Sequence, residues 1–165
     1  MKKTFVMLSA ALMLLGAASC GNKNCSAGKG AGSDKEEVYT GVMPAADVAG
    51  IRYTLRLDYD DDHGYTDGDY DLYETYLQAD STSMTGYRDL KTYTTEGDFR
   101  VETGIPSNPN AKYLKLVPKP HESSPGASNE TLYFLTNPND SSITMLNSQR
   151  ELPDSTRLNY TLRMN

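Results

Sequence analysis

The sequence has no tryptophan and only two cysteines and two histidines among its 165 residues. Thiol and imidazole groups are frequent nucleophiles, general bases and ligands of transition metals. Both histidines, His63 and His121, stand in polar stretches rich in turn-forming residues. No catalytic residue and no metal ligand can be assigned, so we expect that the protein is not an enzyme and needs no cofactor.

Positive charge is also scarce. The chain has 16 Lys and Arg residues against 22 Asp and Glu residues, for a net charge of −6 at pH 7. Nucleic-acid binding and adsorption to anionic lipid both call for clustered basic residues. We therefore expect no nucleic-acid partner and no membrane attachment by charge alone.

Long apolar runs are missing except at the start of the chain. Residues 5–15 are apolar apart from one serine, which is too short to span a bilayer. Two lysines precede this run and small residues follow it, the order of a secretory signal peptide. Residues 15–20 resemble a bacterial lipobox, which implies acylation of Cys20, with palmitate among the acyl chains. We predict a signal peptide over residues 1–19 and a membrane anchor at Cys20; a plain signal peptide is the alternative.

A polar segment follows the predicted anchor. Residues 20–37 have several glycines and almost no apolar side chains, so we predict a flexible linker. With Cys20 acylated, Cys25 has no partner for an internal disulfide. The predicted domain, residues 38–165, must then be held together by its hydrophobic core. Because the chain ends just after the last predicted strand, we expect one domain.

Beyond residue 38, apolar and polar residues alternate. The alternation is clearest in residues 51–58 and 158–164, and it predicts strands with one dry face and one solvated face. Further candidate strands are residues 70–77, 91–94, 98–103, 112–117, 131–136 and 142–146. Predicted turns separate them at residues 62–64, 96–98, 108–109, 137–138 and 118–125. No segment shows a helical period with a cap.

This pattern predicts an all-β protein, a small antiparallel β-barrel of seven or eight strands, because closure of the sheet removes unpaired edges. A two-sheet sandwich is the alternative. The 12 tyrosines suit a β-sheet, since tyrosine packs well on a pleated surface and keeps its hydroxyl in water.

The first predicted strand and the loop after it carry a recognisable motif. Its positions are Tyr39, Gly41, Pro44, Ala45, Asp47, Val48, Gly50 and Ile51. They resemble the motif Tyr-x-Gly-x-Leu-Pro-Cys-x-x-Cys-x-Gly-Ile of the N-terminal domain of the NlpE family, envelope lipoproteins also called copper resistance lipoproteins. Residues 97–99 resemble a Gly-x-Trp of that family, with phenylalanine in place of tryptophan. The resemblance implies a lipocalin-like barrel of the NlpE type.

Ala45 and Val48 stand at the two cysteine positions of this motif. A metal or redox role for the motif needs two thiolates, which these side chains do not supply. The thiol and copper chemistry of the motif is therefore not implied. We expect the loop to act as a lid on one end of the barrel, with both side chains packed there.

The resemblance implies a role in envelope homeostasis or the stress response through contacts with an envelope protein. It also implies a place in the cell envelope, which we take to be the outer membrane facing the periplasm. Two alternatives stay open: binding of a small apolar ligand inside the barrel, and copper binding without the cysteine pair. The acidic run of residues 58–71 begins like a calcium loop, but its glycine is displaced, so a solvated hairpin loop fits better.

Overall fold

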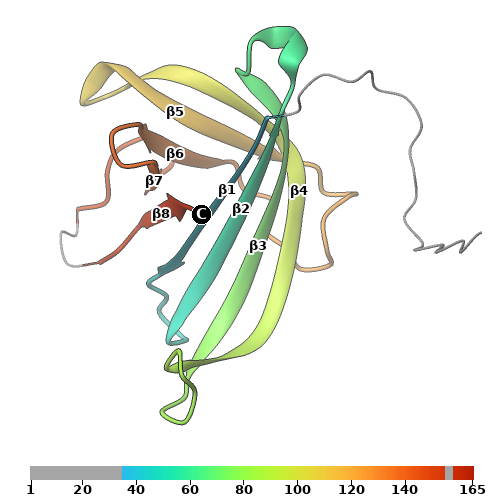
Figure 1. Ribbon diagram of the computed structural model, residues 1–165, viewed down its shortest axis with the longest axis vertical. Helices are drawn as coiled ribbons and strands as arrows, with labels where there is room; N and C mark the ends of the chain where they lie inside the picture. The colour runs from blue at the N-terminus through green and yellow to red at the C-terminus, as the bar shows by residue number, and fades with distance from the viewer. Residues whose placement is uncertain (1–34, 155–157) are drawn as a thin grey trace, which may run out of the picture. The chain divides into compact units, whose positions relative to one another are not determined.

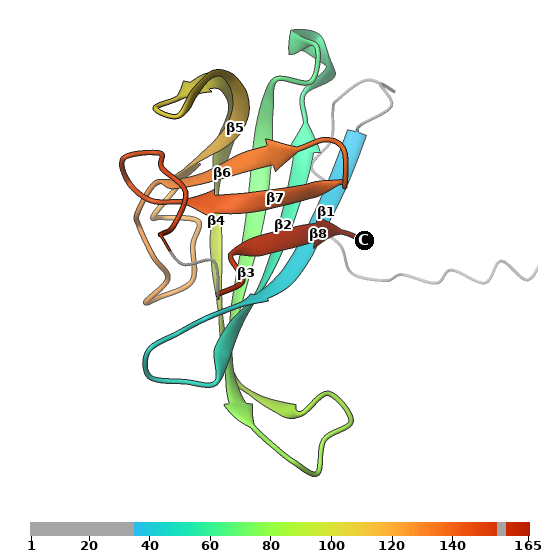
Figure 2. The same ribbon diagram turned by 90° about the vertical axis from the view of Figure 1, so that its left-hand side faces the viewer.

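The computed structural model describes residues 35–154 and 158–165. Within them the chain folds into a closed antiparallel barrel, with the strands in sequence order around it (Figures 1 and 2). The strands are β1 (Lys35–Met43), β2 (Gly50–Tyr59), β3 (Asp67–Ala79), β4 (Tyr87–Ile105), β5 (Asn108–Pro118), β6 (Leu132–Asn137), β7 (Ser142–Leu146) and β8 (Thr161–Met164). The predicted barrel is confirmed, with eight strands, and the sandwich alternative is wrong.

The predicted signal peptide and the anchor at Cys20 lie outside the described residues. The first strand begins at Lys35, inside the predicted linker. In the described part of the chain, the only helical element is a 3₁₀ turn, Asp61–His63. None of these residues forms a helix long and apolar enough to cross a membrane.

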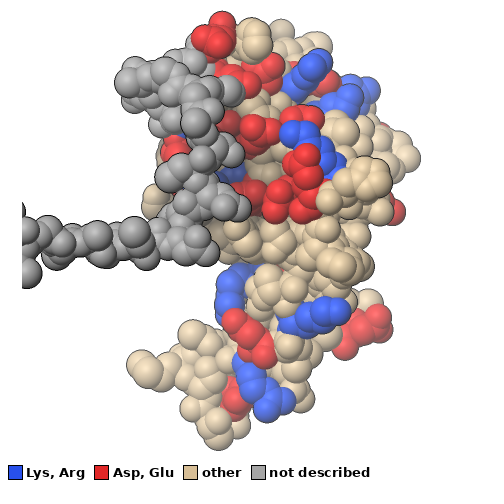
Figure 3. All heavy atoms as spheres, turned by 90° about the vertical axis from the view of Figure 1, so that its right-hand side faces the viewer, with Lys and Arg blue, Asp and Glu red and all other residues tan. Residues whose placement is uncertain are grey.

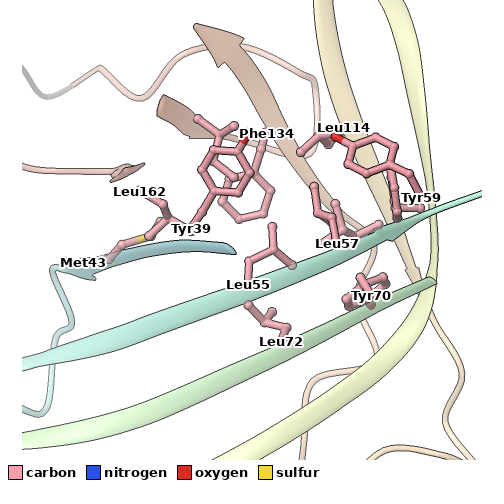
Figure 4. Close-up of a cluster of buried hydrophobic side chains, with 13 residues drawn as sticks. Tyr39, Met43, Leu55, Leu57, Tyr59, Tyr70, Leu72, Leu114, Phe134 and Leu162 are labelled. Atoms are coloured by element: carbon pink, nitrogen blue, oxygen red, sulfur yellow. The ribbon is translucent and has the colours of Figure 1, made fainter. Parts of the chain in front are cut away.

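The alternation in β2 places its leucines inside the barrel. Leu55 and Leu57 are completely buried, whereas Arg56 between them is exposed. Across the ladder, Leu55 lies opposite Leu72 of β3, which is also buried. The same rule applied around the barrel brings together one large cluster (Figure 4).

That cluster fills the middle of the barrel with side chains. Its buried members are Tyr39, Met43, Leu55, Leu57, Tyr59, Tyr70, Leu72, Phe99, Leu114, Leu116, Phe134, Ile143 and Leu162. A smaller cluster of Ile105, Tyr113 and Leu146 packs separately. Two hollows at the protein surface lie at the ends of the barrel, one at each end.

One predicted turn is wrong. Residues 91–94 and 98–103 belong to a single strand, β4, which runs through the Glu96-Gly97-Asp98 sequence without a break. A Cβ atom on Gly97 would lie 2.2 Å from the carbonyl oxygen of Val117 and 2.6 Å from Cε1 of Tyr70. The absence of a side chain at Gly97 therefore lets the backbone of β5 and the ring of Tyr70 lie close to β4, a common role of glycine within strands.

A second predicted turn is misplaced by a few residues. Asn108 and Pro109 begin β5, and the chain turns just before them. Proline is tolerated there because β6 pairs only with residues 113–116 of β5, so Pro109 has no ladder partner in β6. The last strand is also shorter than predicted, since β8 begins at Thr161.

Candidate functional site at the two ends of the barrel

The strand positions of the family motif face the barrel core and its closing strand. Tyr39 is buried, and it pairs in register with Leu55 of β2 and with Met164 of β8. A Cβ atom on Gly41 would lie 2.7 Å from the carbonyl oxygen of Thr161. Only glycine at this position lets β8 approach β1 closely enough to close the barrel.

The motif loop, residues 44–49, joins β1 to β2 at one end of the barrel. Ala45 and Val48 are half-buried, whereas Asp47 between them is exposed. The amide of Ala49 donates a hydrogen bond of 3.0 Å to the carbonyl oxygen of Leu77 on β3. The loop is thus fixed by the backbone, and the lid function expected for its side chains stays a prediction.

The two remaining motif positions stand at the start of β2. Gly50 has a positive φ of 158°, a backbone conformation that other residues rarely adopt. A Cβ atom on Gly50 would also lie 2.9 Å from Cγ1 of Val42, so both the backbone and the packing favour glycine there. Ile51 pairs with Met43 across the hairpin and sets its register.

A hollow of about 530 Å³ separates the motif loop from the hairpin formed by β3 and β4. Its lining residues are Ala46, Asp47, Val48, Ala49, Leu77, Gln78, Ala79 and Leu90. Leu90 is 52 % exposed, and Met84 in the turn of the hairpin is fully exposed. Figure 1 shows this hairpin extending below the other strands. This end of the protein therefore presents apolar side chains to solvent.

The opposite end, which we call the mouth, is polar. Here the carboxylate of Glu37 accepts hydrogen bonds of 2.8 Å from the hydroxyls of Tyr39 and Tyr59. It also forms an ion pair of 2.7 Å with Lys35. Burial alone would raise the pKa of Glu37, but these three donors outweigh it and hold the pKa below its ordinary value. Burial, together with Glu37, raises the pKa of both tyrosines.

The mouth encloses a hollow of about 340 Å³. Its lining residues include Lys35, Glu37, Tyr39, Tyr59, Tyr65, Val101, Lys112, Leu114 and Met164. This site is not predicted from the sequence, because Lys35 and Glu37 belong to a glycine-containing segment with almost no apolar side chains, which indicates a linker. Their alternation with Tyr39 along β1 is the signal that places all three on one face.

Glu74 is a second carboxyl group on the inner face of the sheet. In register it lies between Tyr53 of β2 and Tyr93 of β4. Burial raises the pKa of Glu74, and a hydrogen bond from Tyr53 opposes that shift only in part. Relative to an exposed glutamate, the fold therefore makes Glu74 harder to ionise and Glu37 easier to ionise.

The outer face of β1 to β4 carries a row of carboxylates. Four of them lie opposite one another in register: Glu36, Asp58, Asp69 and Asp98. Figure 3 shows acidic residues gathered in the upper part of one face, with basic residues among them. Lys119 lies 2.6 Å from Asp98 and 3.0 Å from Asp69, and Arg56 lies 3.0 Å from Glu36. These ion pairs offset the repulsion between neighbouring carboxylates.

The remaining candidates of the sequence analysis lie apart from one another. His63 and His121 are exposed in separate loops. The acidic run forms the end of β2, the 3₁₀ turn and the start of β3. Across residues 35–154 and 158–165, no three His, Cys, Asp or Glu side chains come together as ligands of a metal ion.

The chain matches the family model of the NlpE N-terminal domain over residues 39–156. Comparison with curated proteins and with solved structures finds no match. The matched range covers the motif loop and most of the barrel, and NlpE proteins are generally associated with the cell envelope. This chain belongs to the NlpE family, and the barrel is its NlpE N-terminal domain.

Proposed function

We propose that the protein is a non-enzymatic lipoprotein of the bacterial envelope that acts in envelope homeostasis or the stress response through contacts with another protein. Cys20 carries the lipid, and the barrel stands on the periplasmic side of the outer membrane. The family match supports the envelope location. Ala45 and Val48 have no sulfur atom that could bind copper. A contact with another protein is therefore favoured over copper binding at the motif loop.

The observation that carries this proposal is the apolar hollow between the motif loop and the hairpin of β3 and β4. Leu90 is half-exposed at this hollow, and Val48 and Ala79 contribute further apolar surface. The large core cluster is buried inside the barrel, whereas Leu90 and Met84 expose apolar surface to solvent. Exposed apolar surface rimmed by polar residues is typical of protein interaction sites.

Site-specific photo-crosslinking in cells tests the proposal. A photoreactive residue at Leu90 should capture a discrete envelope protein. The same residue at Val117, which is 44 % exposed on β5, is the matched control and should capture none. Equal products at both positions, or no product at Leu90 from protein that is correctly anchored, would contradict the proposed contact.

The anchor is tested separately by Cys20→Ala. The variant lacks the attachment site for the acyl chains, which supply the membrane affinity. It should therefore move from the membrane fraction to the soluble periplasmic fraction. If the variant stays in the membrane fraction, the anchor is not at Cys20.

A further inference from the structure

The mouth has the size and the mixed lining of a site for a small amphiphile. Its volume of about 340 Å³ falls within the range of small-molecule sites in proteins. Tyr59, Val101 and Leu114 supply apolar lining, and Lys35 and Lys112 supply cationic groups. Leu114 is almost completely buried, so the core closes the hollow from below.

One positive charge at the mouth is uncompensated. The ammonium of Lys35 is neutralised by Glu37 at 2.7 Å. Lys112 stands on β5 two positions before Leu114, so it faces the same side of the sheet. Among residues 35–154 and 158–165, no carboxylate forms an ion pair with Lys112, whereas Lys115 on the outer side is paired with Glu102.

A strained residue contributes an aromatic ring to the same hollow. Tyr65 has a left-handed backbone, with a φ of 60°, which is unfavourable for a bulky side chain. Its ring is 40 % exposed and lies edge-on to that of Tyr59, with 6.5 Å between centroids. Strain of this kind persists where the surrounding structure enforces it, and it clusters at ligand sites.

From these features we propose that the mouth binds a single-chain amphiphile with an anionic head. The head lies at the ammonium of Lys112, and the apolar tail lies against the rings of Tyr59 and Tyr65. A carboxylate head and a phosphate head share this chemistry, the first typical of a free fatty acid and the second of a lipid fragment. This site is at the other end of the barrel from the proposed protein contact and does not depend on it.

Calorimetric titration with four probes of equal tail length tests the proposal: octanoate, octyl phosphate, octanol and octylamine. The protein is the full chain carrying Cys20→Ala, so that no detergent competes for the site. Both anionic probes should bind about tenfold more tightly than octanol, because the charge-assisted contact between the anionic head and the ammonium of Lys112 increases the affinity by about that factor. The preference between octanoate and octyl phosphate identifies the source of the ligand. Tightest binding of octylamine, or no saturable binding of any probe, would overturn the proposal.

Two variants and one control locate the site. Lys112→Ala should reduce octanoate affinity about tenfold and leave octanol affinity unchanged. Lys115→Ala, on the same strand but facing outward, should change neither. Tyr65→Gly should weaken all probes to a similar degree, and it keeps the fold because glycine accepts the left-handed backbone without strain. If Lys112→Ala binds octanoate as tightly as the unaltered chain does, the head does not lie at Lys112.

Discussion

The variant Glu37→Gln tests whether the carboxylate at the mouth stabilises the barrel. The side chain of Glu37 is 14 % exposed and holds Lys35, Tyr39 and Tyr59 together, at distances of 2.7 to 2.8 Å. Glutamine keeps the shape and one acceptor oxygen, but it loses the charge that strengthens all three contacts. Hydrogen bonds to charged groups contribute about 1.5–3 kcal/mol each, so we expect a partial loss of about 2 kcal/mol in the free energy of unfolding.

For a domain of this size that loss corresponds to a fall in Tm of about 8 °C at pH 7, read from thermal unfolding by circular dichroism. The matched control is Glu36→Gln, because Glu36 is 47 % exposed and pairs with Arg56 on the surface. A surface ion pair contributes about 0–1 kcal/mol, so the control should lose little.

The pH dependence gives a second check on the same variant. The fold lowers the pKa of Glu37 from its ordinary value of 4.5, so its stabilising effect is complete above that value. The effect is lost as the pH falls through the lowered folded pKa. The difference in Tm between the unaltered protein and Glu37→Gln should therefore be largest at neutral pH and shrink in acid. A difference that does not change with pH, or no difference at pH 7, would refute the charge-based account.

Three further variants test other parts of the structure. Because burial raises the pKa of Glu74, its ionised form weakens the fold as the pH rises through that pKa; Glu74→Gln should raise Tm at pH 7 and have little effect below pH 4.5. Gly97→Ala should lower the free energy of unfolding by about 2–3 kcal/mol in urea titration, because the new methyl group meets the backbone of Val117. An unchanged free energy of unfolding would contradict the crowded position of Gly97 in the sheet. Val48→Asp should lower Tm by about 3 °C, by partial burial of a charge. Ala46→Asp, at an exposed position of the same loop, is its control.

The fold could be predicted from the sequence because its strongest signal is local. Alternation in residues 51–58 fixes which side chains of β2 face inward, and the structure places Leu55 and Leu57 there. Glycine gives no such local signal, because the same residue suits a turn and a crowded strand. The sequence around Gly97 predicts a turn. Only its neighbours on β3 and β5, which are distant in the sequence, show that Gly97 belongs to a strand.

The mouth could not be predicted for a related reason. Lys35 and Glu37 continue a polar segment, so their composition indicates a linker. Their place in the barrel depends on pairing with Tyr59, which is 22 residues from Glu37 and belongs to another strand. Tyr39 lies two residues after Glu37 on β1, but only the register of β1 and β2 brings the charged pair beside Tyr59 as well.

The motif loop keeps its place without the cysteine pair of the family because backbone contacts on both sides hold it. Met43 and Ile51 end the β1–β2 ladder in register, and the amide of Ala49 continues pairing onto Leu77 of β3. A disulfide or a metal at positions 45 and 48 is therefore not needed to shape this loop. The geometry of this loop does not depend on sulfur, so the loop can present the surface on which the proposed protein contact rests.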